Sequence, residues 1–158
     1  VKTYDRKVVK PALEKAEKVG APVVAIMLNN GKIVTGKESN LMNAPSSAIL
    51  NSIKELPGIS DQIHLISPIV LEPILNMKEK IMKSKHPVLN LEEILIALSI
   101  SAATNPTAQL AMTKLVELRN CEAHSTCMLN HTDESILRKL GINLTCEPQF
   151  PSKDLYFV

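Results

Sequence analysis

The chain has few aromatic residues, few cysteines and little net charge. Aromatic residues make up 3% of its 158 residues and tryptophan is absent, whereas 45% of the residues are hydrophobic. The core must therefore be built from Ile, Leu, Val, Ala and Met, and a chain of this length is expected to form one domain with a sizeable interior. A net charge of +2, with acidic and basic residues alternating as in residues 14–18, is typical of solvated helix faces. Nucleic acid is therefore not expected as a partner.

Long hydrophobic runs and targeting signals are also missing. The longest apolar run, around residues 94–103, is far shorter than the ~20 residues that a membrane-spanning helix requires. Residues 1–20 are too charged for a signal peptide. The three cysteines are an odd number without disulfide-framework spacing, so they are interpreted as reduced thiols. These features predict a cytoplasmic protein with no membrane partner.

Turn and capping residues predict alternating helices and strands. Asn30-Gly31 between two β-rich runs is a strong hairpin signal, and it predicts paired strands over residues 23–28 and 32–36. A helix is predicted over residues 5–19, in which Pro11 is either a kink or part of the first turn. Further helices are predicted to begin at Asn43, Ser67, Asn90, Asn105 and Thr132, and further strands at residues 62–66, 121–129 and 142–146.

This order predicts an α/β fold with a mixed five-stranded sheet and helices on both faces, in a single domain over residues 1–158. The opening order of helix, hairpin, helix and strand resembles the cytidine-deaminase-like layout. Zinc deaminases need H-x-E and P-C-x-x-C motifs at helix starts. The second helix begins instead with Ala44-Pro45-Ser46-Ser47, and P-C-x-x-C is absent. Zinc-dependent deamination is therefore not expected.

The spacing Cys121-x-x-His124-x-x-Cys127, together with Cys146, invites a metal site. On a continuous strand, however, Cys121 and Cys127 would lie about 20 Å apart at ~3.3 Å per residue. One zinc ion binds thiolates at ~2.3 Å and cannot reach both. No metal site is expected, and the cysteines are interpreted as small buried hydrophobic residues.

Strand alternation places Glu122, His124 and Thr126 on one face of the predicted strand over residues 121–129. A neutral imidazole beside a carboxylate is a workable general acid/base pair. His124 and Glu122 are therefore the candidate catalytic residues, and Thr126 is a candidate ligand-binding residue. In the ordinary alternative, His124 bridges buried polar groups while Glu122 caps a neighbouring helix. Glu147 either reaches a site at the sheet edge or is a loop carboxylate.

Asn105 and Thr107 begin a predicted helix and are the other candidate ligand-binding residues. Free N–H groups at a helix start can hold a phosphate or carboxylate. Because every helix has such a start, simple capping is the favoured alternative. No cofactor is indicated.

Several segments together resemble one known family. They are DRKVVKPALEKAEKVGAP, VTGK, HLISP, ALSISAATNPTAQLAM, CEAHST, LRKLGINLTCEP and LYFV. The chain is similar to the C-terminal part of the uncharacterised bacterial domain-of-unknown-function family 1846, also known as UPF0371. The resemblance implies a parent roughly three times longer, with an N-terminal Rossmann-like region and a Gly-rich, P-loop-like segment. That segment has no counterpart here, so nucleotide-phosphate binding is not carried over. Cys127 stands where relatives are expected to have an aliphatic residue, which argues against a functional thiol.

Two functions follow as hypotheses. In the first, Glu122, His124 and Asn105 contribute to a site for an anionic or nucleotide-type metabolite, completed by the N-terminal region of a longer protein; the start at Val1 without methionine fits a fragment. In the second, the chain is a non-catalytic packing or self-association domain, because apolar surface left by a missing neighbour favours contact. A homo-oligomer is expected.

Overall fold

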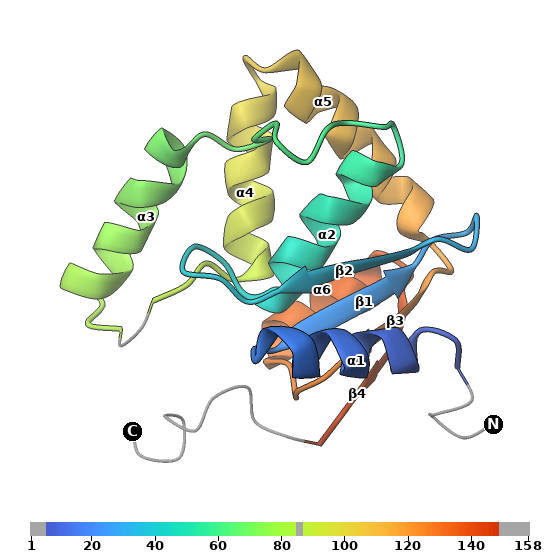
Figure 1. Ribbon diagram of the computed structural model, residues 1–158. Helices are drawn as coiled ribbons and strands as arrows, with labels where there is room; N and C mark the ends of the chain where they lie inside the picture. Colours follow the sequence, from blue (N-terminus) through green and yellow to red (C-terminus); the bar gives the residue numbers. More distant parts are fainter. Residues whose placement is uncertain (1–5, 85–86, 149–158) are drawn as a thin grey trace.

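The described residues, 6–84 and 87–148 of a computed structural model, form a mixed four-stranded sheet with helices on both faces (Figure 1). The strands are β1 (Val23–Met27), β2 (Ile33–Lys37), β3 (Glu122–Ser125) and β4 (Asn143–Cys146). Their order is β2-β1-β3-β4, in which β1 is antiparallel to both β2 and β3, while β3 and β4 are parallel. The helices are α1 (Val9–Val19), α2 (Ala44–Glu55), α3 (Pro68–Lys80), α4 (Leu91–Ala102), α5 (Pro106–Thr113), the 3₁₀ helix η2 (Lys114–Leu118) and α6 (His131–Lys139).

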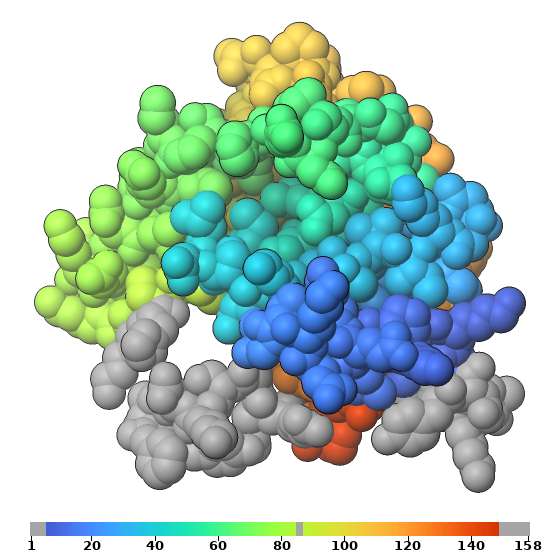
Figure 2. Space-filling model, viewed as in Figure 1, coloured from blue at the N-terminus to red at the C-terminus, as the bar shows by residue number. Residues whose placement is uncertain are grey.

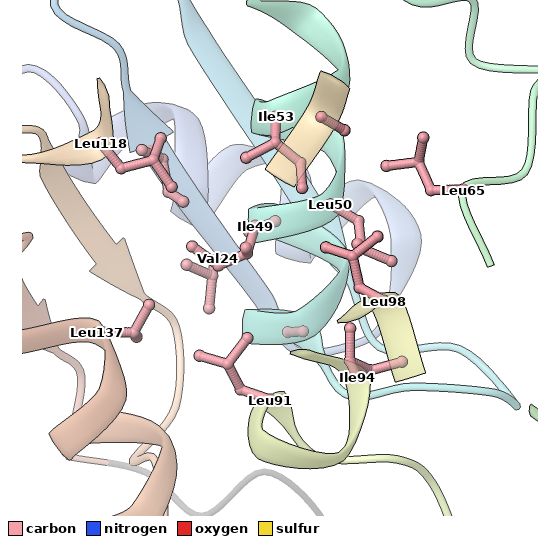
Figure 3. Close-up of a cluster of buried hydrophobic side chains, with 14 of the residues drawn as sticks. Val24, Ile49, Leu50, Ile53, Leu65, Leu91, Ile94, Leu98, Leu118 and Leu137 are labelled. Atoms are coloured by element: carbon pink, nitrogen blue, oxygen red, sulfur yellow. The ribbon is translucent and has the colours of Figure 1, made fainter. Parts of the chain in front are cut away.

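The two faces of the sheet carry different cores. α1 covers one face, where Val8, Val9 and Ala12 pack against Ala25 of β1. The larger core lies on the other face, between the sheet and helices α2, α4, α5 and α6, and it is entirely aliphatic apart from one cysteine. Figure 3 shows part of this core. The prediction of helices on both faces is confirmed.

Side-chain caps fix the predicted helix starts. The Asn43, Ser67, Asn90 and Asn105 side chains each accept a hydrogen bond from a backbone N–H in the first turn of their helix. Asn90 and Glu93 form a full capping box. The last helix begins earlier than predicted, since Asn130 rather than Thr132 supplies its cap. Local polar side chains therefore set these boundaries.

One buried carboxylate joins three of these helix starts. Asp133, 1% exposed, accepts hydrogen bonds from Asn43 Nδ2 at 2.7 Å, Leu91 N at 3.0 Å and Asn130 Nδ2 at 3.1 Å. The N-termini of α2, α4 and α6 consequently converge on α6's first turn. Burial raises the pKa of Asp133 above its usual value, and the three donors oppose that shift.

Close packing of α2 on β2 depends on Gly36. A Cβ at this position would overlap the backbone of Ala48 in α2. The absence of a side chain therefore lets the helix approach the edge strand directly.

The prediction of five strands is wrong, because residues 62–66 form a loop within the described chain. Leu65 and Ile66 are buried, whereas Ile63 and His64 are exposed. The apolar residues that suggested a strand instead anchor the loop in the core. His64 therefore lies at the surface of this loop.

The third strand is also shorter than predicted. β3 ends at Ser125, whose hydroxyl donates to Cys127 O at 2.6 Å and accepts from Cys127 N at 3.3 Å. These two bonds between the Ser125 side chain and the backbone of Cys127, two positions ahead, turn the chain out of the strand. The alternation argument therefore holds for Glu122 to Ser125 and fails beyond it.

Two predicted helices differ in detail. α1 begins at Val9, so Pro11 lies in its first turn and does not kink it; the predicted start at residue 5 lies outside the described residues. α4 is apolar nearly all round. Its buried face is central, yet Ile96 and Ile100 are 53% and 59% exposed.

Candidate functional site

His124 lies at the middle of the sheet face that α1 covers. Its neighbours across the ladder are Ala25 of β1 and Thr145 of β4, and its side chain is 0% exposed. Nδ1 lies 2.7 Å from Thr145 Oγ1, and Nε2 lies 3.1 Å from Glu147 Oε2. Both ring nitrogens of this buried imidazole therefore face polar groups near the edge strand.

The surrounding groups fix the tautomer of His124. A bare nitrogen lone pair facing the Glu147 carboxylate would be repelled, so Nε2 carries the proton. Arg6 Nη1, which can only donate, reaches Thr145 Oγ1 at 2.5 Å. The hydroxyl then directs its own hydrogen to the unprotonated Nδ1. Nε2 and Glu147 are within ion-pair distance, but Nε2 makes no aligned hydrogen bond within the described residues, so the contact is electrostatic.

The imidazole is held in its neutral form. Burial is the main cause that lowers the pKa of His124 below its usual 6.5. The negative charge of the Glu147 carboxylate opposes this shift, while the Arg6 guanidinium reinforces it. A neutral imidazole with a carboxylate beside it is a base ready to take up a proton.

Arg6 connects Thr145, the hydrogen-bond partner of His124, to Glu122. Its Nη2 donates to Glu122 Oε2 at 2.8 Å and to the carbonyl of Asn143 at 2.7 Å. The side chains of Arg6 and Glu122 are 15% and 37% exposed. The structure thus brings Glu122 and His124 to one face, as alternation predicted, but joins them through Arg6 and Thr145. We call the set of Glu122, Arg6, Thr145, His124 and Glu147 the histidine relay.

The sequence pattern predicted Glu122 as the carboxylate beside His124, whereas the structure places Glu147 there. Glu147, left open as a group at the sheet edge or in a loop, is the acid beside His124, and its side chain is only 12% exposed. Arg6 and Thr145 were not identified at all. Strand alternation in residues 142–146 places Thr145 on the same face as Asn143, but only the pairing with β3 sets it beside His124.

The remaining predicted ligand-binding residues serve local structure. Asn105 Oδ1 accepts from the N–H groups of Thr107 at 2.9 Å and Ala108 at 3.3 Å, so it caps its own helix. That helix packs in the larger core, across the sheet from His124. Thr126 Oγ1 accepts from Val23 N at 3.0 Å and extends the ladder by one bond. Asn105 and Thr107 are therefore not brought together with His124.

The three cysteines are free thiols in hydrophobic surroundings. Cys121 and Cys127 are buried, and burial raises the pKa of Cys127 to about 11. A thiol with so high a pKa is protonated near neutral pH and is a poor nucleophile. Within residues 6–84 and 87–148, no three His, Cys, Asp or Glu side chains lie close enough to hold a metal ion.

The relay supports proton transfer through a hydroxyl. Thr145 is half-buried and hydrogen-bonded to the histidine base, so a proton can pass from a group beside Thr145 to His124 Nδ1. The resulting imidazolium would be stabilised by Glu147 at 3.1 Å. Arg6 holds the Thr145 oxygen in place for this transfer.

Comparison with known proteins places the chain in a family. The family described as "Domain of unknown function DUF1846, C-terminal" matches residues 4–156. UPF0371 proteins of Clostridium botulinum (strain Eklund 17B / Type B), Clostridium tetani and Clostridioides difficile are 53%, 52% and 50% identical to it. Each comparison covers 99% of this chain and 33% of the relative.

The chain therefore spans about a third of the length of the curated relatives it matches. Among the described helices, none combines the length and the apolar character that crossing a membrane would require. The resemblance inferred from the sequence motifs is confirmed: the chain belongs to the DUF1846 family, also called UPF0371, and matches its C-terminal domain.

Proposed function

We propose that this domain contributes an acid/base relay to a small-molecule site that other parts of a longer protein complete. The observation that carries the proposal is the placement of His124, fully buried between Thr145 Oγ1 and the Glu147 carboxylate. Burying a polar ring with an unaligned Nε2 has a free-energy cost, and such costs are concentrated at functional sites.

The relay favours a particular class of reacting group. It contains two carboxylates and one guanidinium around a neutral imidazole, an excess of one negative charge. A neutral or positively charged proton donor, such as an alcohol or amine, suits this environment better than an anion does. The sequence-based preference for an anionic or nucleotide-type metabolite relied on the helix start at Asn105, which lies across the sheet.

A comparison of binding and turnover tests this proposal. Full-length protein would be incubated with pooled metabolites, and compounds retained or converted would be identified by mass spectrometry. His124→Gln and Glu147→Gln are expected to abolish conversion while the melting temperature changes little. His131→Gln, at an exposed histidine at the start of α6, is the matched control and is expected to have no effect.

Equal conversion by wild type and both relay variants would refute the proposal. If His124→Gln unfolds the domain, the Glu147→Gln result decides, because Glu147 follows β4 and belongs to neither hydrophobic core cluster.

The alternative function, packing or self-association, also has a supporting observation. Four large apolar side chains on α3 and just beyond it are exposed: Ile69 (80%), Met77 (45%), Ile81 (76%) and Met82 (62%). Burying such surface is favourable by roughly 25 cal/mol per Å². These residues support a contact with a second copy or with the rest of a longer protein.

We further propose that the fold follows the cytidine-deaminase-like layout. The helix–hairpin–helix opening and the central position of β1, antiparallel to both neighbours, support this assignment. The three free thiols support the predicted cytoplasmic location.

A further inference from the structure

A pocket lies across the sheet from the histidine relay. Its volume is about 300 Å³, and it is formed by α2, the residues after β2 and the loop that leads into α3. Figure 2 shows the surface hollowed here, between the cyan residues that follow β2 and the green residues that precede α3. The volume is at the small end of the ~300–1,000 Å³ typical of ligand sites.

The pocket contains a buried lysine, Lys54, that makes no close ion pair with any of the described residues. Lys54 of α2 is 8% exposed, and its Nζ donates to the carbonyl of Asp61 at 2.9 Å. No carboxylate forms an ion pair with Lys54 in the described part of the chain. An ammonium group has three donors, so two remain for a ligand. Burial lowers the pKa of Lys54, and the more distant Asp61 carboxylate opposes that shift.

A different lysine of similar burial shows how such a charge is normally neutralised. Lys78 Nζ, with a side chain 14% exposed, pairs with Glu93 Oε1 at 2.8 Å and also donates to Val88 O at 2.7 Å. Lys54 likewise donates to a backbone carbonyl, but among residues 6–84 and 87–148 it makes no ion pair with a carboxylate. Buried charges in proteins are generally paired, so an anionic group bound in the pocket would supply the close partner that Lys78 has in Glu93.

The walls of the pocket are mainly aliphatic. Leu50, Ile66 and Leu71 are buried at its base, while Leu41 and Ile63 are 38% and 43% exposed at its rim. Exposed aliphatic side chains around a buried cation suit a molecule with one charged end and an apolar body.

We propose that this pocket binds a small monocarboxylate with an aliphatic body. The carboxylate accepts hydrogen bonds from Lys54 Nζ, with Lys37 at the rim adding positive charge. The aliphatic body lies against Leu41 and Ile63. Of the two lysines that line the pocket only Lys54 is buried, and one compact ammonium charge matches one carboxylate, whereas a phosphate is typically held by several donors at once. The site is separate from the histidine relay and does not depend on it.

The test is an NMR titration of the ¹⁵N-labelled chain with hexanoate, 1-hexanol and inorganic phosphate. Hexanoate is expected to shift the amides of residues 37–42, 50–54 and 63–66 in a saturable manner. Hexanol has the same body without the charge and is expected to bind roughly tenfold more weakly or worse, because a charge-assisted hydrogen bond is lost. Phosphate is expected to leave these amides unchanged.

Two variants locate the binding. Lys54→Met keeps the aliphatic stem and removes the charge, and it is expected to weaken hexanoate binding roughly ten- to hundredfold. Lys18→Met removes the same charge from an exposed position on α1, on the other face of the sheet, and is the matched control. Ile63→Ser, at an exposed position, is expected to weaken hexanoate roughly threefold or more while acetate binding stays unchanged.

Several results would overturn the proposal. They are the absence of a saturable shift with hexanoate, equal affinity for hexanol, phosphate shifting the same amides at equal concentration, or unchanged hexanoate affinity in Lys54→Met. If Lys54→Met does not fold, unchanged hexanoate affinity in Ile63→Ser overturns it.

Discussion

Replacing Asp133 with alanine is expected to lower the free energy of unfolding by about 3 kcal/mol. The carboxylate accepts hydrogen bonds from Leu91 N, Asn43 Nδ2 and Asn130 Nδ2. Leu91 is 0% exposed, so its N–H would lose its acceptor with no access to water, at a cost of about 2 kcal/mol. The two asparagine amides line an adjacent pocket, where water can replace the lost acceptor. The loss of each of these two hydrogen bonds is therefore expected to cost only about 0.5 kcal/mol.

Urea denaturation followed by circular dichroism measures this change. Glu134→Ala is the control, because Glu134 is the next residue of α6 and its side chain, 41% exposed, pairs with Arg138 one turn on. That pair is expected to contribute about 0.3–0.5 kcal/mol. A loss in Asp133→Ala no larger than in Glu134→Ala would refute the idea that this carboxylate holds three helix starts together.

The pH dependence of the difference in unfolding free energy between wild type and Asp133→Ala provides a second check. Because burial raises the folded pKa of Asp133 above the usual 3.8, the folded state favours the protonated acid. The contribution of this group to stability is therefore largest below pH 3.8 and decreases as pH rises through the folded pKa. The gap between wild type and Asp133→Ala should widen as the pH is lowered, and a gap that narrows would contradict this sign.

Three further changes have definite expected results. Gly36→Ala should destabilise the fold by roughly 3 kcal/mol or more in thermal unfolding, since its Cβ would overlap the backbone of Ala48; a stable variant would contradict the close packing of α2 on β2. Because the folded pKa of His124 is lowered, the free energy of unfolding should fall as pH drops below about 6.5, and His124→Gln should remove that part of the dependence. By light scattering, a dimer or larger oligomer is expected at high concentration, and Ile69→Glu with Ile81→Glu should shift it towards monomer; a wild-type monomer up to millimolar concentration counts against self-association.

Features that depend on near neighbours in the chain were predictable from the sequence. Asn43, Ser67, Asn90 and Asn105 cap helices by accepting from N–H groups two or three residues ahead, so the capping pattern alone reveals them. The β1–β2 hairpin is equally local. Its Gly31 adopts the positive φ of 89° that the turn signal requires.

Features that depend on distant pairing were not predictable in this way. Arg6 meets Glu122 and Thr145 across 116 and 139 residues of sequence, and the register of β4 decides which residue lies beside His124. No periodicity encodes those distances. The strand predicted over residues 62–66 is a loop for a related reason. A short apolar run is compatible with a buried strand and with a loop anchored in the core, and only the tertiary structure distinguishes them.

The protonation state of His124 tests the proposed relay most directly. Long-range ¹H–¹⁵N correlation of the histidine ring nitrogens, recorded between about pH 8 and 5 and assigned with His124→Gln, reports which nitrogen carries a proton. The relay predicts a neutral ring with the proton on Nε2, facing Glu147, a bare Nδ1 facing Thr145, and a pKa below 6.5. A doubly protonated ring near neutral pH, or a proton on Nδ1 with Nε2 bare, would contradict it.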